Sequence, residues 1–319
     1  MSYSEGNERT GKSKMPKKRI LFVGTACVCF SADTPYIPAP GELITSRGNY
    51  DTCPGGHGLL SAIASGRLGG DPAFCACVGQ DYYGDRLKEI CKREGMHVSN
   101  VESLAEEQTA LQVRLTEKDG TRRRIWLPGA ASRLNAATVK TAFSCYPDAI
   151  TVSSSCPEEV LIAASETAKE RGVPFVLDED PDGPLLDLLP LEKLESAELM
   201  IVNEARSDGE NGFCVSREDK QKQLCYALRK RANVHAIVMR LGSKGCFLYD
   251  GKYFSLVSAP DAETVDPDGT EAVFTAAFVG EYLSSHDLLK ASQCANAAAS
   301  YTASRKGGYV SLPERKEEN

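Results

Sequence analysis

The segment 265–278 contains the residues best placed to do chemistry, and it reads VDPDGTEAVFTAAF. A strand-like run at 253–257 leads into an acidic, glycine-containing turn, and an apolar stretch of helical length follows at 272–283. This order places four residues at a helix N-terminus: Gly269, Thr270, Glu271 and Ala272. Backbone amides there lack intrahelical partners and the helix dipole is positive, so a phosphoryl group or another anion would be favoured. The alternative is an ordinary turn before a core helix.

The elements that must position these residues follow an alternating pattern. Short apolar strand candidates occupy 19–23, 73–78, 149–153, 173–178, 199–202 and 236–241. Helical patterns separate them, at 59–68, 85–94, 157–171 and 217–231. Strands that alternate with helices predict an α/β fold whose parallel sheet is covered on both faces. Ligands of such sheets gather at the carboxyl ends of the strands.

Two segments, about 31–53 and 110–128, interrupt this alternation with extended, turn-punctuated patterns. Within the second, 110–116 and 123–127 are candidates for paired strands around Asp119 and Gly120. Three consecutive arginines follow this turn: Arg122, Arg123 and Arg124. Short runs of like charge usually face water, so we expect a solvated hairpin flank there.

Size and charge restrict the classes of function. The chain has 319 residues, of which 42% are hydrophobic, so it can bury a substantial core as one large α/β domain or as two domains. The net charge of −7 gives no basic field, and we expect no nucleic-acid partner. No apolar stretch approaches the ~20 residues that span a bilayer, and the N-terminus lacks the apolar core of a signal peptide. We expect a cytoplasmic protein without membrane contact.

The 12 cysteines are spread along the chain and include no C-x-x-C pair. Because the chain is far longer than the small secreted domains that need disulfide scaffolds, we expect most of them to be buried, reduced thiols.

Five segments of the chain carry spaced motifs. They read IPAPGELI at 37–44, PGGHGLLSAIASGRLGG at 54–70, CVGQDYYG at 77–84, VDPDGTEAVFTAAF at 265–278 and AAASYTASRKGGYVSLP at 297–313. Together they resemble, in content and order, the ribokinase or PfkB family of carbohydrate kinases, over about 19–313. The family's second signature, V-D-T-x-G-A-G-D-x-F, is in register with Val265, Asp266, Gly269 and Phe274. Several matches in the right order are a specific signal, whereas one alone would be weak.

The resemblance implies a ribokinase-like three-layer α/β sandwich with a mostly parallel central sheet and a small β-sheet lid. This domain would span 19–313, with lid segments inserted at about 31–53 and 110–128. A disordered basic tail at 1–18 would precede it, and a charged tail at 314–319 would follow. The resemblance also implies ATP-dependent phosphoryl transfer to a hydroxyl of a sugar or nucleoside, and a homodimer that pairs through the lid.

The same resemblance implies that the chemical centre of the site has changed. The aspartate that serves the family as general base falls on Ala272, which cannot accept a proton, and the glycine before it falls on Glu271. Where the family contacts the sugar with Asn, Asp, two glycines, Lys, Asn and a carboxylate, the chain has Cys27, Cys29, Gly55, Gly56, His57, Leu60 and Ser155. The glycines needed for backbone geometry remain, whereas the polar groups that serve a ligand are gone.

Nucleotide and metal positions are also implied by the resemblance. In the family's N-x-x-E motif, which organises magnesium, Asn203 remains but Arg206 replaces the glutamate. The phosphate loop and an adenine contact correspond to Arg240, Gly242, Ser243, Gly245 and Asn296. ATP or ADP with Mg²⁺ would bind weakly, with Arg206 and Arg240 either replacing the charge of magnesium or simply filling the cleft. A potassium loop would use Asp266, Asp268, Thr302, Arg305, Gly307 and Ser311, although Pro267 and Asp268 depart from its usual pattern.

A second reading concerns three cysteines and a histidine. Cys27 and Cys29 are two apart on a strand and share a face, and Cys53 precedes His57 with C-x-x-x-H spacing. Soft thiolates and an imidazole could bind zinc. The alternative is a desolvated pocket packed with small thiols.

Two hypotheses of function remain. The first is a sugar or nucleoside kinase of this family with little or no activity, because loss of a general base costs ~10²–10⁴ in rate. Glu271 could substitute for the base, but one residue along a helix rotates a side chain by about 100°, and its charge would oppose a phosphate. The second is a non-catalytic sensor or binding protein for a small molecule or nucleotide on the same fold.

Overall fold

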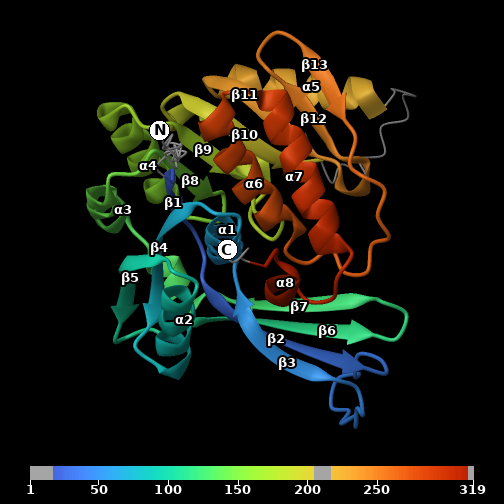
Figure 1. Cartoon of the computed structure of the whole chain (residues 1–319). Coiled ribbons are helices and arrows are strands. Elements are labelled where there is room, and N and C mark those ends of the chain that lie inside the picture. The colour runs from blue at the N-terminus through green and yellow to red at the C-terminus, as the bar shows by residue number, and fades with distance from the viewer. Residues whose placement is uncertain (1–16, 205–216, 315–319) are drawn as a thin grey trace, which may run out of the picture.

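The computed structural model describes residues 17–204 and 217–314. One large sheet forms its centre. Its parallel strands are β1 (Arg19–Val23), β4 (Asp71–Gly79), β5 (His97–Leu104), β8 (Ala149–Ser153), β9 (Phe175–Asp178), β10 (Ala197–Asn203) and β11 (Val234–Arg240). At one edge, β12 (Cys246–Tyr249) and β13 (Phe254–Val257) run antiparallel. The order is β13-β12-β11-β10-β9-β8-β1-β4-β5 (Figure 1).

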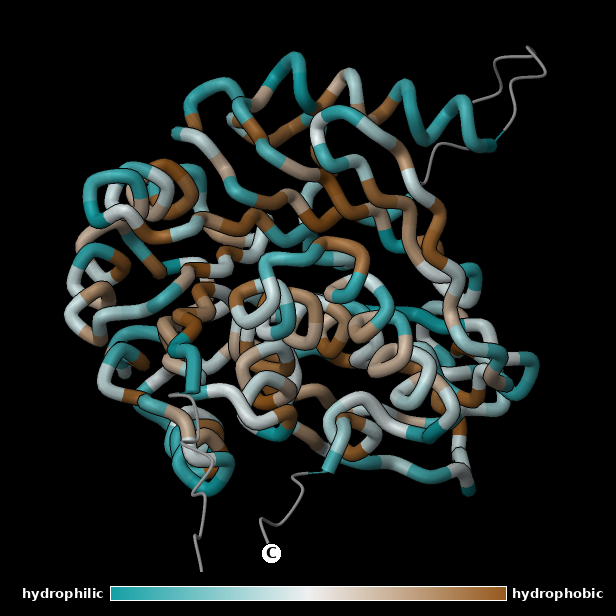
Figure 2. The backbone as a smooth tube through the Cα atoms, turned by 45° about the horizontal axis from the view of Figure 1, so that its top comes forward, coloured by the Kyte–Doolittle hydropathy of each residue, from teal (hydrophilic) through white to brown (hydrophobic). Residues whose placement is uncertain are grey.

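Helices cover both faces of this sheet. One face carries α1 (His57–Arg67), α2 (Tyr82–Arg93), α6 (Thr270–Ser285) and α7 (Leu288–Ala303), and the other carries α3 (Ala136–Ala142), α4 (Glu158–Arg171) and α5 (Arg217–Arg231). Alternate strand residues serve the two cores, as with Phe22 on the first face and Leu21 on the second. Hydrophobic residues accordingly follow the strands, and hydrophilic ones the outer helices and loops (Figure 2). The predicted three-layer α/β sandwich is confirmed.

A second sheet of four strands lies at the end of the molecule below α1 and α6 in Figure 1. It contains β3 (Tyr50–Gly55), β2 (Cys27–Thr34), β6 (Ala110–Glu117) and β7 (Arg122–Leu127), in that order. The predicted pairing around Asp119 and Gly120 is confirmed, because β6 and β7 are antiparallel neighbours. We call this four-stranded sheet the lid. Its first strand begins at Cys27, four residues before the segment expected from the sequence, because the chain leaves β1 directly into β2.

The remaining elements are short. They are α8 (Gly308–Ser311), η1 (Gly129–Arg133), η2 (Phe143–Cys145), η3 (Leu186–Leu188), η4 (Leu191–Lys193) and η5 (Gly242–Lys244). The predicted strands and helices match the observed ones to within a few residues, but α3, β5, β12 and α7 were not predicted. The strand β5 alternates polar and apolar residues irregularly, and α7 is rich in alanine and serine with only a side-chain cap, Asp287, to mark its start.

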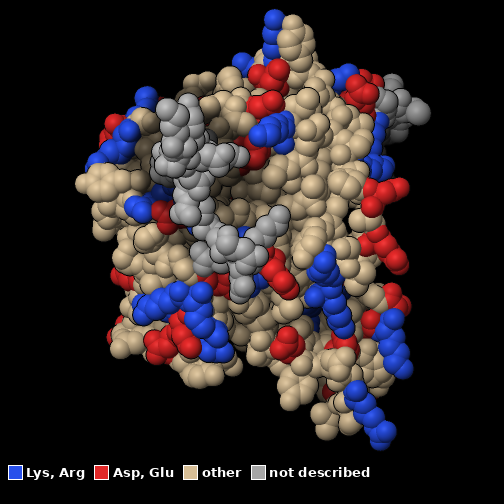
Figure 3. Space-filling view, in the orientation of Figure 1, with Lys and Arg blue, Asp and Glu red and all other residues tan. Residues whose placement is uncertain are grey.

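The surface of the described residues has no feature that indicates a particular function. Acidic and basic side chains are interspersed over the described part of the face in Figure 3. Within 17–204 and 217–314, no helix has the length and apolarity that a membrane span requires. The cysteines in these ranges are all free thiols, most of them buried. The expected tails at 1–18 and 314–319 lie mostly outside the described residues.

Candidate functional site

A cavity of about 490 Å³ lies between the lid and the large sheet's helices. All four lid strands contribute side chains to it. The opposite wall comes from the N-termini of α1 and α6 and from the loops after β8 and β9. The carboxyl ends of parallel strands thus meet the lid here, where the α/β pattern predicts a ligand.

Two helices begin at this cavity with a glycine in the left-handed region. Gly56 (φ 96°) precedes α1 and Gly269 (φ 85°) precedes α6, and neither helix has a side-chain cap. A Cβ on Gly56 would lie 2.4 Å from the carbonyl oxygen of Thr25, so only glycine fits there. Because uncapped helix starts leave backbone amides available, this wall of the cavity is suited to an anion.

The predicted base position lies at this wall. Ala272 is buried and lines the cavity beside Glu271 and Gly269. The cavity is also lined by four carboxylates: Asp180, Asp182, Asp268 and Glu271. Glu271 accepts a hydrogen bond from the hydroxyl of Thr270 at 3.0 Å. Thr270 itself does not line the cavity within the described residues.

Asp180 is held by the loops around it. It accepts hydrogen bonds from the hydroxyl of Ser153 at 3.3 Å and from the backbone N–H of Asp182 at 3.0 Å. Its own N–H donates to the hydroxyl of Ser154 at 2.9 Å. Asp180 was not among the predicted site residues, although its place just after a buried strand indicates such a role.

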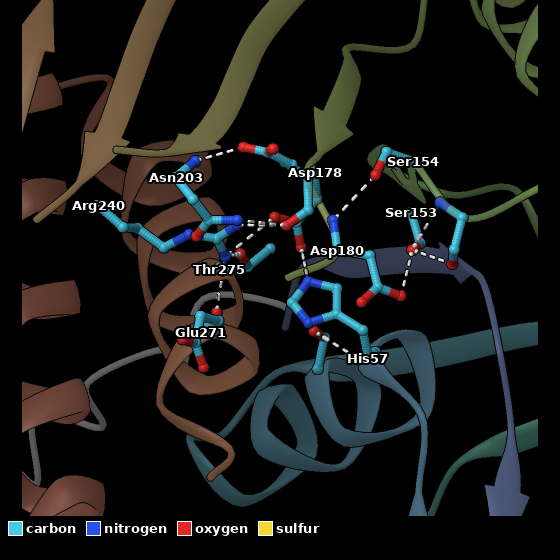
Figure 4. A network of polar contacts seen from close by, with 12 residues as sticks. His57, Ser153, Ser154, Asp178, Asp180, Asn203, Arg240, Glu271 and Thr275 are labelled. Atoms are coloured by element: carbon cyan, nitrogen blue, oxygen red, sulfur yellow. Dashed lines mark hydrogen bonds and ion pairs between the residues drawn. The ribbon is translucent and has the colours of Figure 1, made fainter. Parts of the chain in front are cut away.

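A buried network joins α1, β9, β11 and α6 behind the cavity (Figure 4). Nε2 of His57 lies 2.5 Å from Oδ2 of Asp178, and Nη1 of Arg240 lies 3.2 Å from Oδ1 of the same carboxylate. Arg240 also donates to the carbonyl oxygen of Glu271 at 3.2 Å and to the hydroxyl of Thr275 at 3.3 Å. Its other terminal nitrogen donates to a carbonyl at the end of β9. The guanidinium therefore connects the start of α6 to the strand ends.

The charges in this network support one another. Burial lowers the pKa of His57, but the carboxylate of Asp178 raises it more, so its pKa lies above the ordinary value. Burial raises the pKa of Asp178, but the charges of His57 and Arg240 and the hydrogen bond from His57 hold it below the ordinary value. The network therefore favours an ionised Asp178 between two cations.

The positions expected to contact a sugar all line the cavity: Cys27, Cys29, Gly55, Gly56, His57, Leu60 and Ser155. The structure therefore brings this set together. Ser155 also shares a hydrogen bond with Ser153, their Oγ atoms being 2.8 Å apart. The wall formed by β2 and β3 presents thiols in place of amide and carboxylate groups.

Arginines of the lid contact the loop that precedes α6. Nη2 of Arg122 lies 3.2 Å from Oδ1 of Asp266, and its Nη1 lies 3.2 Å from Oδ1 of Asp268. Arg114, on β6, also forms an ion pair with Asp268. Two arginines from two lid strands thus meet the carboxylates of the loop before α6, and they compensate its negative charge.

The opposite side of the cavity has a similar contact. Arg124 forms an ion pair with Asp182, which also accepts from the side-chain amide of Gln112 at 3.2 Å. The arginine run is exposed and flanks the β6–β7 hairpin, as expected, but Arg122 and Arg124 also line the cavity with Trp126, which was not expected. Strand residues alternate between faces, so the i, i+2, i+4 spacing of these three side chains was the missed signal.

The residues of the expected potassium loop are brought close only in part. Asp266 is buried, and its Oδ2 accepts from the backbone N–H of Gly307 at 3.0 Å. The hydroxyl of Thr302 is buried without a hydrogen-bond partner, as a cation ligand would be. However, the guanidinium of Arg122 lies against Asp266, where it supplies the positive charge. The oxygen atoms of Asp266 and Thr302 are suitable ligands for a monovalent cation, but the positive charge of Arg122 beside Asp266 opposes its binding. Of the other expected ligands, Arg305 donates its backbone N–H to the carbonyl of Thr302 at the end of α7, and Ser311, in α8, donates its own to the carbonyl of Gly307.

The expected nucleotide residues lie apart from the cavity. Arg240 belongs to the buried network, which favours the interpretation that it fills the cleft. Gly242 and Ser243 are exposed in η5, and Gly245 follows them with φ 98°. Asn296, on α7, donates its amide to the carbonyl of Val257 at 2.8 Å.

Two further expected positions concern magnesium. Asn203 ends β10 and donates its side-chain amide to a carbonyl of the β9 end at 3.4 Å. Arg206 lies outside the described residues. No group of three or more His, Cys, Asp and Glu within 17–204 and 217–314 could hold a metal ion. The zinc reading of Cys27, Cys29, Cys53 and His57 is therefore wrong, because the imidazole is turned to Asp178.

Comparisons with known proteins identify the same architecture. The family model for pfkB family carbohydrate kinases matches residues 17–315. Ribokinase from Haemophilus influenzae is 24% identical over 303 residues, covering 94% of this chain and 97% of that protein. Probable fructokinase-5 from Arabidopsis thaliana is 28% identical over 312 residues, covering 92% of this chain and 94% of that protein. The structure of Arabidopsis thaliana ribokinase complexed with ribose and ATP matches with a TM-score of 0.81 and 26% identity, covering 95% and 97% of the two chains.

Proposed function

The chain belongs to the pfkB family of carbohydrate kinases, and on that premise we propose that it binds a small molecule in the lid cavity but phosphorylates it slowly or not at all. The observation that supports this most directly is Ala272, a methyl group at the start of α6 where the resemblance requires a proton acceptor. Loss of a general base typically lowers the rate ~10²–10⁴-fold.

Three of the four carboxylates that line the cavity are poor substitutes for that base. Asp268 is ion-paired with lid arginines and Asp182 with Arg124. Glu271 is next to the base position but about 100° away around the helix. Its charge at the start of α6 also opposes the approach of a phosphoryl group, which the helix N-terminus would otherwise favour.

The sugar side of the cavity supports the same proposal. A hydroxyl-rich ligand needs hydrogen-bond partners there, and each lost partner of a buried group costs about 1–3 kcal/mol. Cys27 and Leu60 cannot replace amide or carboxylate groups, so we propose that ribose is a poor ligand. A less polar molecule with an anionic or weakly polar group suits the thiols, Trp126 and the arginines better.

Nucleotide binding is proposed only in a weakened form. Ribokinase of Arabidopsis thaliana was determined with ribose and ATP bound, and the exposed turn at Gly242 could still approach a phosphate here. Arg240, by contrast, is committed to Asp178 and to the first turn of α6. We therefore propose weak ATP or ADP binding that depends little on magnesium.

A non-catalytic binding protein or sensor is the second candidate. The arginine contacts between the lid and the loops below it favour this candidate, because they can close the lid without any transferred phosphate. We also propose that the chain is a cytoplasmic homodimer that pairs through the lid, with a small molecule as its ligand.

The test combines turnover with binding. The full-length protein is assayed for ADP release over a panel of neutral and anionic sugars and nucleosides, and the same panel is titrated by calorimetry. We expect turnover below about 0.1 per second, against about 1–100 per second for kinases, with binding heat for at least one compound. Faster turnover that Glu271→Gln abolishes would refute the proposal. Turnover without saturable binding of any compound in the panel would refute the second candidate, a non-catalytic binding protein.

A further inference from the structure

Two cysteines of the cavity wall face each other across the lid. Cys29, on β2, is in antiparallel register with Cys53, on β3. Residues directly opposite in such a pair have Cα atoms about 4.5 or 5.5 Å apart, and both values are within the ~4.4–6.8 Å range of disulfides. The thiol of Cys29 also lies 3.6 Å from Oε1 of Gln112, to which it donates when protonated. The two cysteines could therefore be joined with little movement of the backbone.

The two thiols differ in acidity. The hydrogen bond from Cys53, together with the charges of Arg114 and Arg124, outweighs burial and lowers the pKa of Cys29 to about 7. The same hydrogen bond and burial raise the pKa of Cys53 far above its usual value. Cys29 is therefore the more acidic thiol of the pair, and Cys53 keeps its proton near neutral pH. The first is suited to be a nucleophile and the second to resolve its oxidised form.

Other cysteines do not combine these features. Cys27 lies on the same strand face, but burial raises its pKa well above the usual value. Cys294 is exposed on α7, yet its pKa is also raised by partial burial and by the charge of Glu281. Within the described residues, Cys29 and Cys53 are thus distinguished by register, contact and the neighbouring arginines.

We propose that Cys29 and Cys53 are a redox modification site, at which a hydroperoxide oxidises the pair to a disulfide across β2 and β3. The Cys29 thiolate attacks the terminal oxygen of the hydroperoxide, so an S–O bond forms and the O–O bond breaks. The leaving alkoxide or hydroxide takes a proton from water. The Cys53 sulfur then attacks the sulfenic sulfur, the S–S bond forms, and hydroxide leaves with the Cys53 proton as water. The two cysteines lose two electrons and the hydroperoxide gains them.

The bond would change the wall of the cavity. It closes the loop from Cys29 to Cys53, which carries the tip of the lid, and it removes a negative charge from beside Arg114 and Arg124. Closing a loop in this way restricts the chain that it encloses. Ligand access to the cavity would therefore differ between the reduced and oxidised protein. This inference does not depend on the proposed function, because it concerns the thiols alone.

The experiment treats the reduced, full-length protein with hydrogen peroxide and blocks remaining thiols with N-ethylmaleimide. Intact mass and non-reducing peptide mapping follow. We expect a loss of two hydrogens and a linked Cys29–Cys53 peptide, both reversed by dithiothreitol. In Cys53→Ser, oxidation should stop at a Cys29 sulfenic acid that dimedone traps. In Cys27→Ser, the matched control on the same strand face, the linked peptide should still form.

Several results would overturn the proposal. One is faster oxidation of Cys294 than of Cys29 in the wild-type protein. Another is thiol loss without a linked Cys29–Cys53 peptide, including oxidation of Cys29 directly to the sulfinic acid. Because the decisive reaction uses the unmodified chain, a failure of either variant to fold leaves the test intact, and far-ultraviolet circular dichroism identifies such a variant.

Discussion

Asp178 is a buried carboxylate that keeps its charge because two cationic side chains lie against it. Placing an ion in the protein interior is costly unless it is paired and hydrogen-bonded. His57 and Arg240 approach its two oxygens from α1 and β11, so the carboxylate connects three elements that are distant in sequence. The same network holds the first turn of α6 through the carbonyl of Glu271. One residue therefore supports the wall on which Ala272 lies.

Removing this carboxylate should destabilise the fold strongly. We expect Asp178→Asn to lower the free energy of unfolding by about 3–5 kcal/mol, because His57 and Arg240 would be left buried without a counter-charge. Urea denaturation followed by circular dichroism measures the change. Asp180→Asn is the matched control, since its partners are hydroxyl and backbone groups that an amide oxygen can still accept from. Equal losses in the two variants would contradict the role of the charge network.

The pKa of His57 makes part of this stability depend on pH. Because the folded-state pKa lies above the ordinary value of 6.5, the contribution of protonated His57 is fully present below that value. It is lost as the pH rises through the folded-state pKa. The melting temperature of the wild-type protein should therefore exceed that of His57→Gln at about pH 6, and the difference should shrink with rising pH. A difference that stays constant into the alkaline range would show that His57 contributes only packing.

At the scale of elements, the lid is connected to the large domain by three arginines that alternate along β6 and β7. Arg114 and Arg122 contact the loop before α6, and Arg124 contacts the loop after β9. The contacts lie on two sides of the cavity, so they resist both hinge opening and sliding of the lid. They are partly exposed, and pairs of this kind contribute about 0.2–1 kcal/mol each.

Weakening one contact should loosen the lid measurably. In Arg122→Gln, hydrogen exchange of the β6 and β7 amides should rise about 1.5- to 5-fold. The effect should diminish in high salt, which screens the contact in the wild-type protein as well. Arg123→Gln is the matched control, because the neighbouring side chain points to the other face of the strand. If both variants exchange alike, the lid is not held through Arg122.

The same arginine should make the protein indifferent to potassium. Its guanidinium supplies the positive charge beside Asp266, so the wild-type protein should melt at the same temperature in potassium chloride as in sodium chloride of equal concentration. Arg122→Gln leaves Asp266 and the buried Thr302 hydroxyl for a cation, and potassium should then stabilise it relative to sodium. A potassium-specific rise in the wild-type melting temperature would contradict this assignment.

The sequence predicts features that depend on local patterns of residues, but not contacts between residues that are far apart in the chain. Alternating apolar segments predict the large sheet, because a buried parallel strand is apolar along its whole length. Motif positions such as Gly56 and Ala272 do line one cavity. The inward direction of Arg122 was missed because three consecutive charges were treated as one block. The pairing of His57 with Asp178, 121 residues apart, depends on where α1 meets β9, and no local pattern encodes that distance.

At the scale of the whole molecule, the outer face of the lid exposes more apolar side chains than is usual for a sheet face in contact with solvent. The side chains of Cys29, Arg114 and Arg124 line the cavity. Side chains alternate along a strand, so the residues adjacent to them in sequence face outward. Ile125 and Leu127, on the edge strand β7, are 55% and 49% exposed. Exposed apolar surface on a sheet with two open edges favours association. A second copy of the lid would cover it and would agree with the homodimer that the family resemblance implies.

The assembly should therefore depend on this face. We expect sedimentation of the full-length protein at micromolar concentration to give a dimer, and Ile125→Lys to shift it to monomer by placing a charge in the covered surface. Leu256→Lys is the matched control, since Leu256 is also an exposed aliphatic residue, at 63% against 55% for Ile125, and lies on β13 at the far edge of the large sheet. A monomeric wild-type protein would contradict the predicted dimer. A dimer that persists in Ile125→Lys but dissociates in Leu256→Lys would show that the interface lies outside the lid. Because the lid also forms one wall of the cavity, dissociation should raise hydrogen exchange in β2 and β3 together with β7, which links the assembly to ligand access.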